Sequence, residues 1–135
     1  YKVGAFGINN VEPIWGSNFF YHLSKSKIGL NISRGDYQKL YSSDRISSLI
    51  GNGLLVFLER KTKLNSMFKD KKEVVFFDNK EDLLKKIIYY LENDKIRRKI
   101  ARNGSKKYHK NFNNIEVTKY MLAKLGFGNY KNNWF

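Results

Sequence analysis

Hydroxyl and guanidinium side chains stand close together at the start of a short predicted helix, and these groups bind phosphate. Ser42 and Ser43 come just before the helix, and Arg45 lies in its first turn. A helix start also presents backbone N–H groups without acceptors and the positive end of the helix dipole. A guanidinium beside it can bond two phosphate oxygens at once. These residues therefore predict an anion site suited to a diphosphate.

More candidate ligand-binding residues occur in the loop that leads to this helix. Ser33 and Arg34 follow directly after an apolar stretch, so Arg34 is expected to close the far side of the anion site. Tyr41, or alternatively Tyr37, offers an aromatic ring that can stack on a base or a sugar. The loop is thus expected to bind a ligand that has both phosphate and ring components.

The alternative interpretation of the same residues is structural. Ser43 and Asp44 are residue types that cap a helix start, and in this reading they do nothing else. Arg45 would then form an ion pair with Asp44 or with Glu12. The spacing alone favours neither interpretation.

Two apolar strands must position this loop and helix. The segments 27–32 (KIGLNI) and 53–58 (GLLVFL) are continuous apolar runs, as in strands buried on both faces. The helix between them has apolar side chains at helical spacing, and Gly53 is placed to end it. A strand, a helix and a strand in this order predict a parallel βαβ unit. Ligands of such units bind beyond the carboxyl ends of the strands, where the loop 33–42 is expected.

The rest of the chain extends this pattern to an α/β fold. Further strands are predicted over 1–7 and 73–77, and further helices over 17–25, 80–92, 94–104 and 115–125. The side chains expected to face the core from the last three helices are Leu83, Leu84, Ile87, Ile88, Leu91, Ile96, Ile100, Ala101, Val117, Met121, Leu122 and Leu125. This order predicts a Rossmann-like, mainly parallel sheet flanked by helices.

Length and composition set the scale of the fold. The 135 residues suffice for one domain, expected over 1–126 with a tail over 127–135. Because the chain starts with Tyr1 and a predicted strand, we expect a piece of a longer protein. No apolar run reaches the length of a membrane span. With no cysteine, two histidines and no Asp-x-Asp pair, no bound metal or other cofactor is expected.

The formal net charge of +14 has two explanations. One is a polyanionic partner, either nucleic acid or an anionic membrane surface. The other is a general abundance of lysine in the composition, with the lysines scattered over helix faces and turns. The second is favoured because no long block of one sign exists. We therefore expect no specific nucleic-acid partner, a cytoplasmic location and, at most, weak association with an anionic membrane.

Two segments resemble a known family. SKIGLNISRG followed by YSSDRISSLIGNGLLVFLE is similar to the C-terminal domain of group 1 glycosyltransferases of the GT-B fold, closest to the branch of spore-maturation CgeB-like proteins. The resemblance covers about residues 1 to 110. The matching residues are Lys27, Ile28, Leu30, Asn31, Ile32, Ser33, Ser43, Asp44, Arg45, Gly53, Leu54, Leu55, Glu59, Phe68, Lys69, Asp70, Glu73, Val74, Val75, Leu83, Leu84, Tyr90, Leu91, Asn93, Asp94, Arg97 and Gly104.

The resemblance implies the donor-binding half of a two-domain enzyme. A nucleotide-diphosphate sugar would bind at the strand ends, facing an N-terminal acceptor domain that supplies the general base, and no metal would be needed. Arg45 and the helix that starts at Ser43 would stabilise the leaving diphosphate. Residues and resemblance together give as donor-binding candidates Ser33, Arg34, Tyr41, Ser42, Ser43, Asp44 and Ser48, with Arg45 in the catalytic role.

One departure from the family pattern affects the expected donor site. Ser48 stands where related enzymes have a glutamate that contacts the donor, and the second glutamate of the usual pair would fall at Leu40. The alternative function is therefore a non-catalytic, decayed GT-B-like module that binds a protein partner or an anionic surface. A nucleic-acid-binding domain is a third hypothesis, which rests on charge alone.

Overall fold

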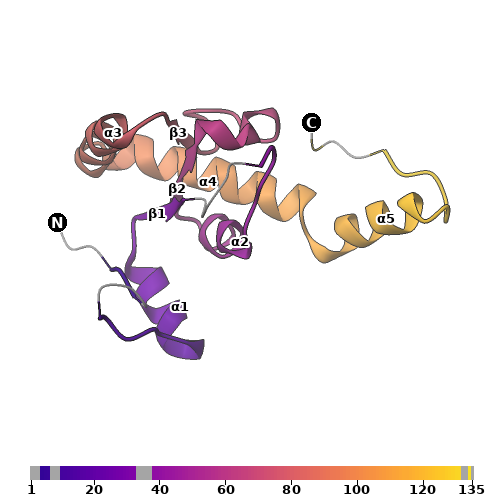
Figure 1. The fold of residues 1–135 in the computed structure, drawn as a ribbon, viewed down its shortest axis with the longest axis horizontal. Helices are drawn as coiled ribbons and strands as arrows, with labels where there is room; N and C mark the ends of the chain where they lie inside the picture. Colours follow the sequence, from indigo (N-terminus) through magenta and orange to yellow (C-terminus); the bar gives the residue numbers. More distant parts are fainter. Residues whose placement is uncertain (1–3, 7–9, 33–37, 132–133, 135) are drawn as a thin grey trace.

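A three-stranded parallel sheet forms the centre of the chain (Figure 1). The computed structural model describes residues 4–6, 10–32, 38–131 and 134. The strands β1 (Ile28–Asn31), β2 (Leu55–Glu59) and β3 (Val75–Phe77) lie in the order β1-β2-β3. Both neighbouring pairs are parallel, with Ile28 opposite Leu55 and Phe57 opposite Val75. The predicted βαβ unit is confirmed.

Helices lie before, between and after the strands. Their bounds are α1 Gly16–Lys25, α2 Asp44–Gly51, α3 Lys80–Glu92, α4 Asp94–Asn111 and α5 Asn114–Lys124, with two 3-10 turns, η1 Arg60–Thr62 and η2 Leu64–Ser66. Within the described residues, no helix is both long enough and apolar enough to cross a membrane.

Both faces of the sheet are buried, because side chains of β2 alternate between two core clusters. Val56 and Leu58 pack on the face that α2 and η2 cover, together with Ile50. Leu55 and Phe57 pack on the opposite face with side chains of β3, α3 and α4. The fold is therefore α/β and Rossmann-like, as predicted.

Helix α3 confirms a prediction of its start from the sequence. Asn79 accepts a hydrogen bond at its side chain from the backbone N–H of Asp82, 2.9 Å away. The carboxylate of Asp82 in turn accepts from the backbone N–H of Asp78 at 3.0 Å. These bonds satisfy N–H groups at the start of the helix, and α3 has the bounds expected from the sequence.

Several predicted element bounds differ from the structure. Residues 4–6 of the predicted first strand form no strand, and the rest of that segment lies outside the described residues. Helix α1 starts at Gly16 after Trp15, one residue before Ser17. Helix α4 continues seven residues past Gly104, which is buried inside it. Gly104 permits close packing on the backbone of Glu73 and does not end the helix.

Several side chains predicted to face the core are exposed instead. Leu84 is 59% exposed and Ile96 is 44% exposed, whereas Tyr90 of α3 is buried against Phe57. Leu83 and Ile87 pack against the core as predicted, whereas Tyr90 takes the place of Leu84 and Ile88 on the buried side of α3. Ile100 and Ala101 of α4 are buried as predicted.

Helix α5 stands apart from the sheet (Figure 1). None of its described residues is buried, so the prediction of a core-facing stripe there is wrong. Met121, Leu122 and Leu125 are exposed, the last of them 71%. Trp134 links α5 to the end of α4, and its ring centroid lies 4.7 Å from that of Tyr120 of α5. The same ring lies 5.4 Å from Phe112, just after α4, and its Nε1 donates to the carbonyl of Asn111 at 2.8 Å.

Candidate donor-binding site

The predicted anion site lies at the carboxyl end of β1, where α2 begins. β1 ends at Asn31, and the residue before α2 is Ser43, with an extended backbone at φ −85° and ψ 162°. Gly53 follows the helix with φ +78°, as the predicted helix end requires. The end of β1 and the start of α2 thus lie at the edge of the sheet at which ligands of parallel sheets bind.

Ser43 joins the end of β1 to the start of α2. Its Oγ donates a hydrogen bond to Oδ1 of Asn31 at 2.9 Å, and Asn31 is only 2% exposed. Ser43 makes no side-chain hydrogen bond to the first turn of α2. The interpretation of Ser43 as a helix cap alone is therefore wrong. Within the described part of the chain, the N–H groups at the start of α2 thus have no side-chain cap.

Arg45 is held beside that helix start. Its guanidinium donates from one terminal nitrogen to the backbone carbonyl of Ile32, 3.1 Å away, and the residue is exposed. Among the described residues, Arg45 forms no ion pair with Asp44 or Glu12, so the alternative pairing from the sequence is wrong. Among the described residues, the bond to Ile32 is the one side-chain hydrogen bond of the guanidinium, which lies next to the first turn of α2.

A backbone hydrogen bond fixes the loop before α2 to the segment after β2. The N–H of Leu40 donates to the carbonyl of Thr62 at 2.8 Å, and Leu40 has φ +62°. Thr62 is buried, and its hydroxyl donates to the carbonyl of Glu59 at 2.7 Å. Leu40 also packs against the core cluster below α2. Leu40 therefore serves packing in this chain.

The other predicted site residues differ in how the structure places them. Tyr41 and Ser42 are exposed in the loop directly before Ser43, and Asp44 is exposed in the first turn of α2. Ser48 is half-buried one turn further along α2. Ser33 and Arg34 lie outside the described residues. The carboxylate of Asp44 weakens the attraction of this helix start for anions, so Arg45 is needed to offset it.

Glu59 is a residue at this edge that the sequence did not single out as a site residue. It ends β2, the central strand, and is 9% exposed. Its place at the carboxyl end of a buried strand is the signal in the sequence that could have pointed to it.

Arg60, the next cation along the chain, is committed to structural contacts. Its guanidinium bonds Asp70 and Asp78, each at 3.0 Å. The hydrogen bond with Asp70 is the main reason that the pKa of Arg60 is raised. Arg60 therefore stabilises the segment after β2 and is unsuited to bind phosphate. Within the part of the chain that the structure describes, no three His, Asp or Glu side chains gather as a metal site would require.

Comparisons with known proteins assign the family. A family model described as glycosyl transferase-like matches residues 2–123, which is most of the chain. No curated protein and no solved structure matches it. The matched segment includes the complete sheet, α2 with Ser43 and Arg45, and most of α5. The chain therefore belongs to the glycosyl transferase-like family and is a glycosyltransferase domain.

Proposed function

We propose that this domain binds the nucleotide-diphosphate sugar donor of the transfer reaction. The observation that supports the proposal best is the open start of α2, where the Ser43 hydroxyl bonds Asn31 and makes no cap. Arg45, an exposed residue, stands beside it and bonds the carbonyl of Ile32. In this proposal the chain is the C-terminal half of a GT-B enzyme of the CgeB-like branch. An N-terminal domain would bind the acceptor and supply the general base.

The proposed chemistry uses fixed dipoles and one cation. As the bond between the sugar and the diphosphate breaks, negative charge grows on the leaving phosphate oxygens. Backbone N–H groups at the start of α2 and the guanidinium of Arg45 stabilise this charge without reorganising. Tyr41 and Ser42 lie on the approach to the same helix start and can contact the base or the sugar. No metal takes part in this scheme, and the domain acts in the cytoplasm, at most weakly associated with an anionic membrane.

Replacing Arg45 tests the proposal directly. The labelled chain is titrated with UDP, GDP, ADP and CMP in turn, and amide chemical shifts are recorded. One nucleotide is expected to shift the amides of residues 42–48. Arg45→Ala should weaken that binding at least about tenfold, because a charge-assisted bidentate contact is lost.

The matched control is Lys85→Ala, which removes one exposed positive charge from α3, away from the site. Binding that is equally weak in both variants would show that general charge is responsible and would contradict a role for Arg45. Absence of shifts at 42–48 with all four nucleotides would contradict the donor site in this chain.

Ser48→Glu is expected to strengthen binding of UDP by about tenfold, because a carboxylate accepts hydrogen bonds from sugar hydroxyls more strongly than a serine does. Titration calorimetry of both proteins with UDP measures the difference. Ser48→Gln is the matched control, since it adds similar length without charge. Equal or weaker binding by the glutamate variant would contradict a role for this position in donor contact.

A non-catalytic binding module is the second candidate. The packing of Leu40 against the core favours it, because a position given to a glutamate in the family pattern here has no polar side chain. This candidate predicts that none of the four nucleotides binds at 42–48. The same titration therefore separates the two functions.

A further inference from the structure

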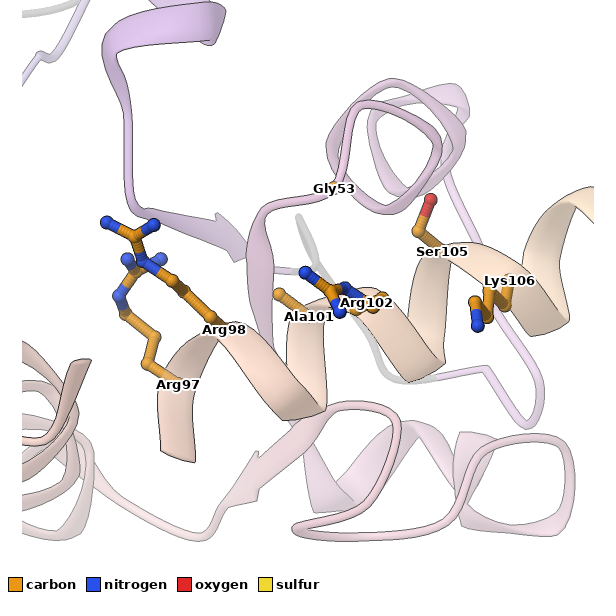
Figure 2. A pocket seen from close by; sticks show the side chains of 7 residues that line it. All are labelled: Gly53, Arg97, Arg98, Ala101, Arg102, Ser105 and Lys106. Carbon is orange, nitrogen blue, oxygen red and sulfur yellow. The ribbon is translucent and has the colours of Figure 1, made fainter. Parts of the chain in front are cut away.

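A second positively charged site lies at the opposite edge of the sheet. Gly53 precedes β2, so it stands at the amino ends of the strands, whereas Ser43 and Arg45 stand at the carboxyl ends. A pocket of about 310 Å³ opens there between the turn with Gly53 and the outer face of α4 (Figure 2). Its lining residues are Gly53, Arg97, Arg98, Ala101, Arg102, Ser105 and Lys106.

The lining side chains are strongly biased in charge. Four of them are cations, one has a hydroxyl and none is a carboxylate. In Figure 2, Arg97 and Arg98 project from α4 on the side of β1, and Ser105 projects toward the turn with Gly53. Such a set of donors without acceptors is suited to an anion with several oxygens.

The nearest carboxylate is already shared by three cations. Asp94 bonds Arg97 at 2.6 Å and Arg98 at 2.5 Å, and Lys27 lies 4.0 Å from it. The hydrogen bond from Arg97 is the main cause of the lowered pKa of Asp94. One negative charge therefore faces three positive charges before the rest of the pocket is counted.

Arg102 and Lys106 add two more charges that have no partner. Both are exposed, and neither has a hydrogen bond or an ion pair among the described residues. They stand four positions apart on α4, so their side chains are neighbours and repel each other. An anion between them would replace this repulsion with two attractive contacts.

We propose that this pocket binds a phosphate group, in the form of a phosphomonoester dianion. Arg102 offers a planar fork of donors, Lys106 offers a compact charge, and Ser105, which projects toward the turn with Gly53, offers a hydroxyl (Figure 2). The cavity volume exceeds that of a phosphate group, which leaves space for the atoms to which the phosphate is attached. The site is separate from the donor site and does not depend on it.

Chemical-shift mapping at constant ionic strength tests the pocket. The labelled 135-residue chain is titrated with glycerol 3-phosphate, with chloride as the balancing anion. Shifts are expected at Gly53, Ala101, Arg102, Ser105 and Lys106. The double variant Arg102→Ala, Lys106→Ala should weaken the binding at least about tenfold.

A second double variant, Lys95→Ala with Lys110→Ala, is the matched control. It removes the same charge from exposed positions of the same helix outside the pocket, and its affinity should change less than about twofold. Ser105→Glu, which keeps both cations and places a carboxylate in the pocket, should also abolish the binding. Equal weakening by both double variants, or shifts confined to residues 42–48, would overturn the proposal.

A second measurement distinguishes two possible sources of the phosphate, a lipid headgroup and a soluble phosphomonoester. Vesicles of phosphatidylcholine, with and without phosphatidic acid, are sedimented with the chain and with both double variants. Binding to phosphatidic acid that only the Arg102 and Lys106 variant loses identifies a lipid headgroup. Binding of glycerol 3-phosphate without vesicle binding identifies a soluble phosphomonoester. Failure of both ligands to bind would overturn the proposal.

Discussion

Replacing Gly104 by alanine should destabilise the domain by about 2–3 kcal/mol. A Cβ at this position would lie 2.1 Å from the carbonyl oxygen of Glu73 and 3.2 Å from its carbonyl carbon. Both atoms belong to the backbone just before β3, so no flexible side chain can move aside. Helix α4 would have to shift away from the sheet, which would open the core around Ala101. Urea unfolding followed by far-UV circular dichroism measures the loss.

Gly51→Ala is the matched control for this prediction. Gly51 is the last residue of α2, and a Cβ there would meet nothing within 4 Å. Alanine is the better helix former, so this variant should gain up to about 0.5 kcal/mol. If the free energy of unfolding rises in Gly51→Ala and falls in Gly104→Ala, close packing at Gly104 is the cause of the destabilisation. A stabilised Gly104→Ala variant would contradict the close contact with Glu73.

Replacing Arg97 by alanine should destabilise the domain by about 2–3 kcal/mol. The Arg97 side chain is 8% exposed and bonds two different elements. Its Nε and Nη2 bond Asp94 at 3.2 Å and 2.6 Å, and its Nη1 donates to the carbonyl of Lys27 at 3.1 Å. The variant would lose the link between the start of α4 and the start of β1. Urea unfolding at neutral pH measures the effect.

Arg98→Ala is the matched control, because it removes the same charge from an exposed position and so separates the effect of burial from the effect of charge. Arg98 bonds the same carboxylate at 2.5 Å, but its side chain is 71% exposed. Solvent screens an exposed pair, so its loss should cost less than about 1 kcal/mol. Comparable losses in both variants would contradict the role given to burial.

The pH dependence gives a second control on Arg97. Asp94 has its pKa held below the ordinary 3.8, chiefly by the hydrogen bond from Arg97. A carboxyl with a depressed pKa stabilises the folded state above its unfolded-state pKa, and this contribution is lost as the pH falls through the folded-state pKa. The difference between Arg97→Ala and the parent chain should therefore shrink below pH 3.8. The part of the destabilisation that comes from losing the hydrogen bond of Arg97 to the Lys27 carbonyl should remain at low pH.

The sequence predicts local structure best where a short-range rule and the tertiary fold agree. The bounds of α3 follow from Asn79, which bonds the backbone three residues on, and from the apolar run before it. The βαβ unit follows from two apolar strands around one amphipathic helix. Gly104 misled the prediction because a glycine also serves close packing, and the partner that requires it, Glu73, lies 31 positions earlier in the chain.

The position of the candidate site was predictable, but its hydrogen bonds were not. The order of strand, loop and helix places Ser43 and Arg45 at the ligand edge of any parallel sheet. Whether Ser43 caps the helix or bonds Asn31 depends on how closely β1 and α2 approach each other, and local spacing does not determine that distance. The basic pocket was also not predicted, because it combines α4 with a turn more than forty residues earlier.

The isolation of α5 has a consequence for how this chain unfolds. No side chain of α5 is buried, so its opening is coupled to the sheet mainly through the ring of Trp134. The other tryptophan, Trp15, is 79% exposed at the start of α1. Neither fluorophore lies in the two core clusters. Tryptophan emission should therefore follow the release of α5 at low denaturant, while circular dichroism follows the sheet and its covering helices. We therefore expect at least two cooperative units, each with its own free energy of opening.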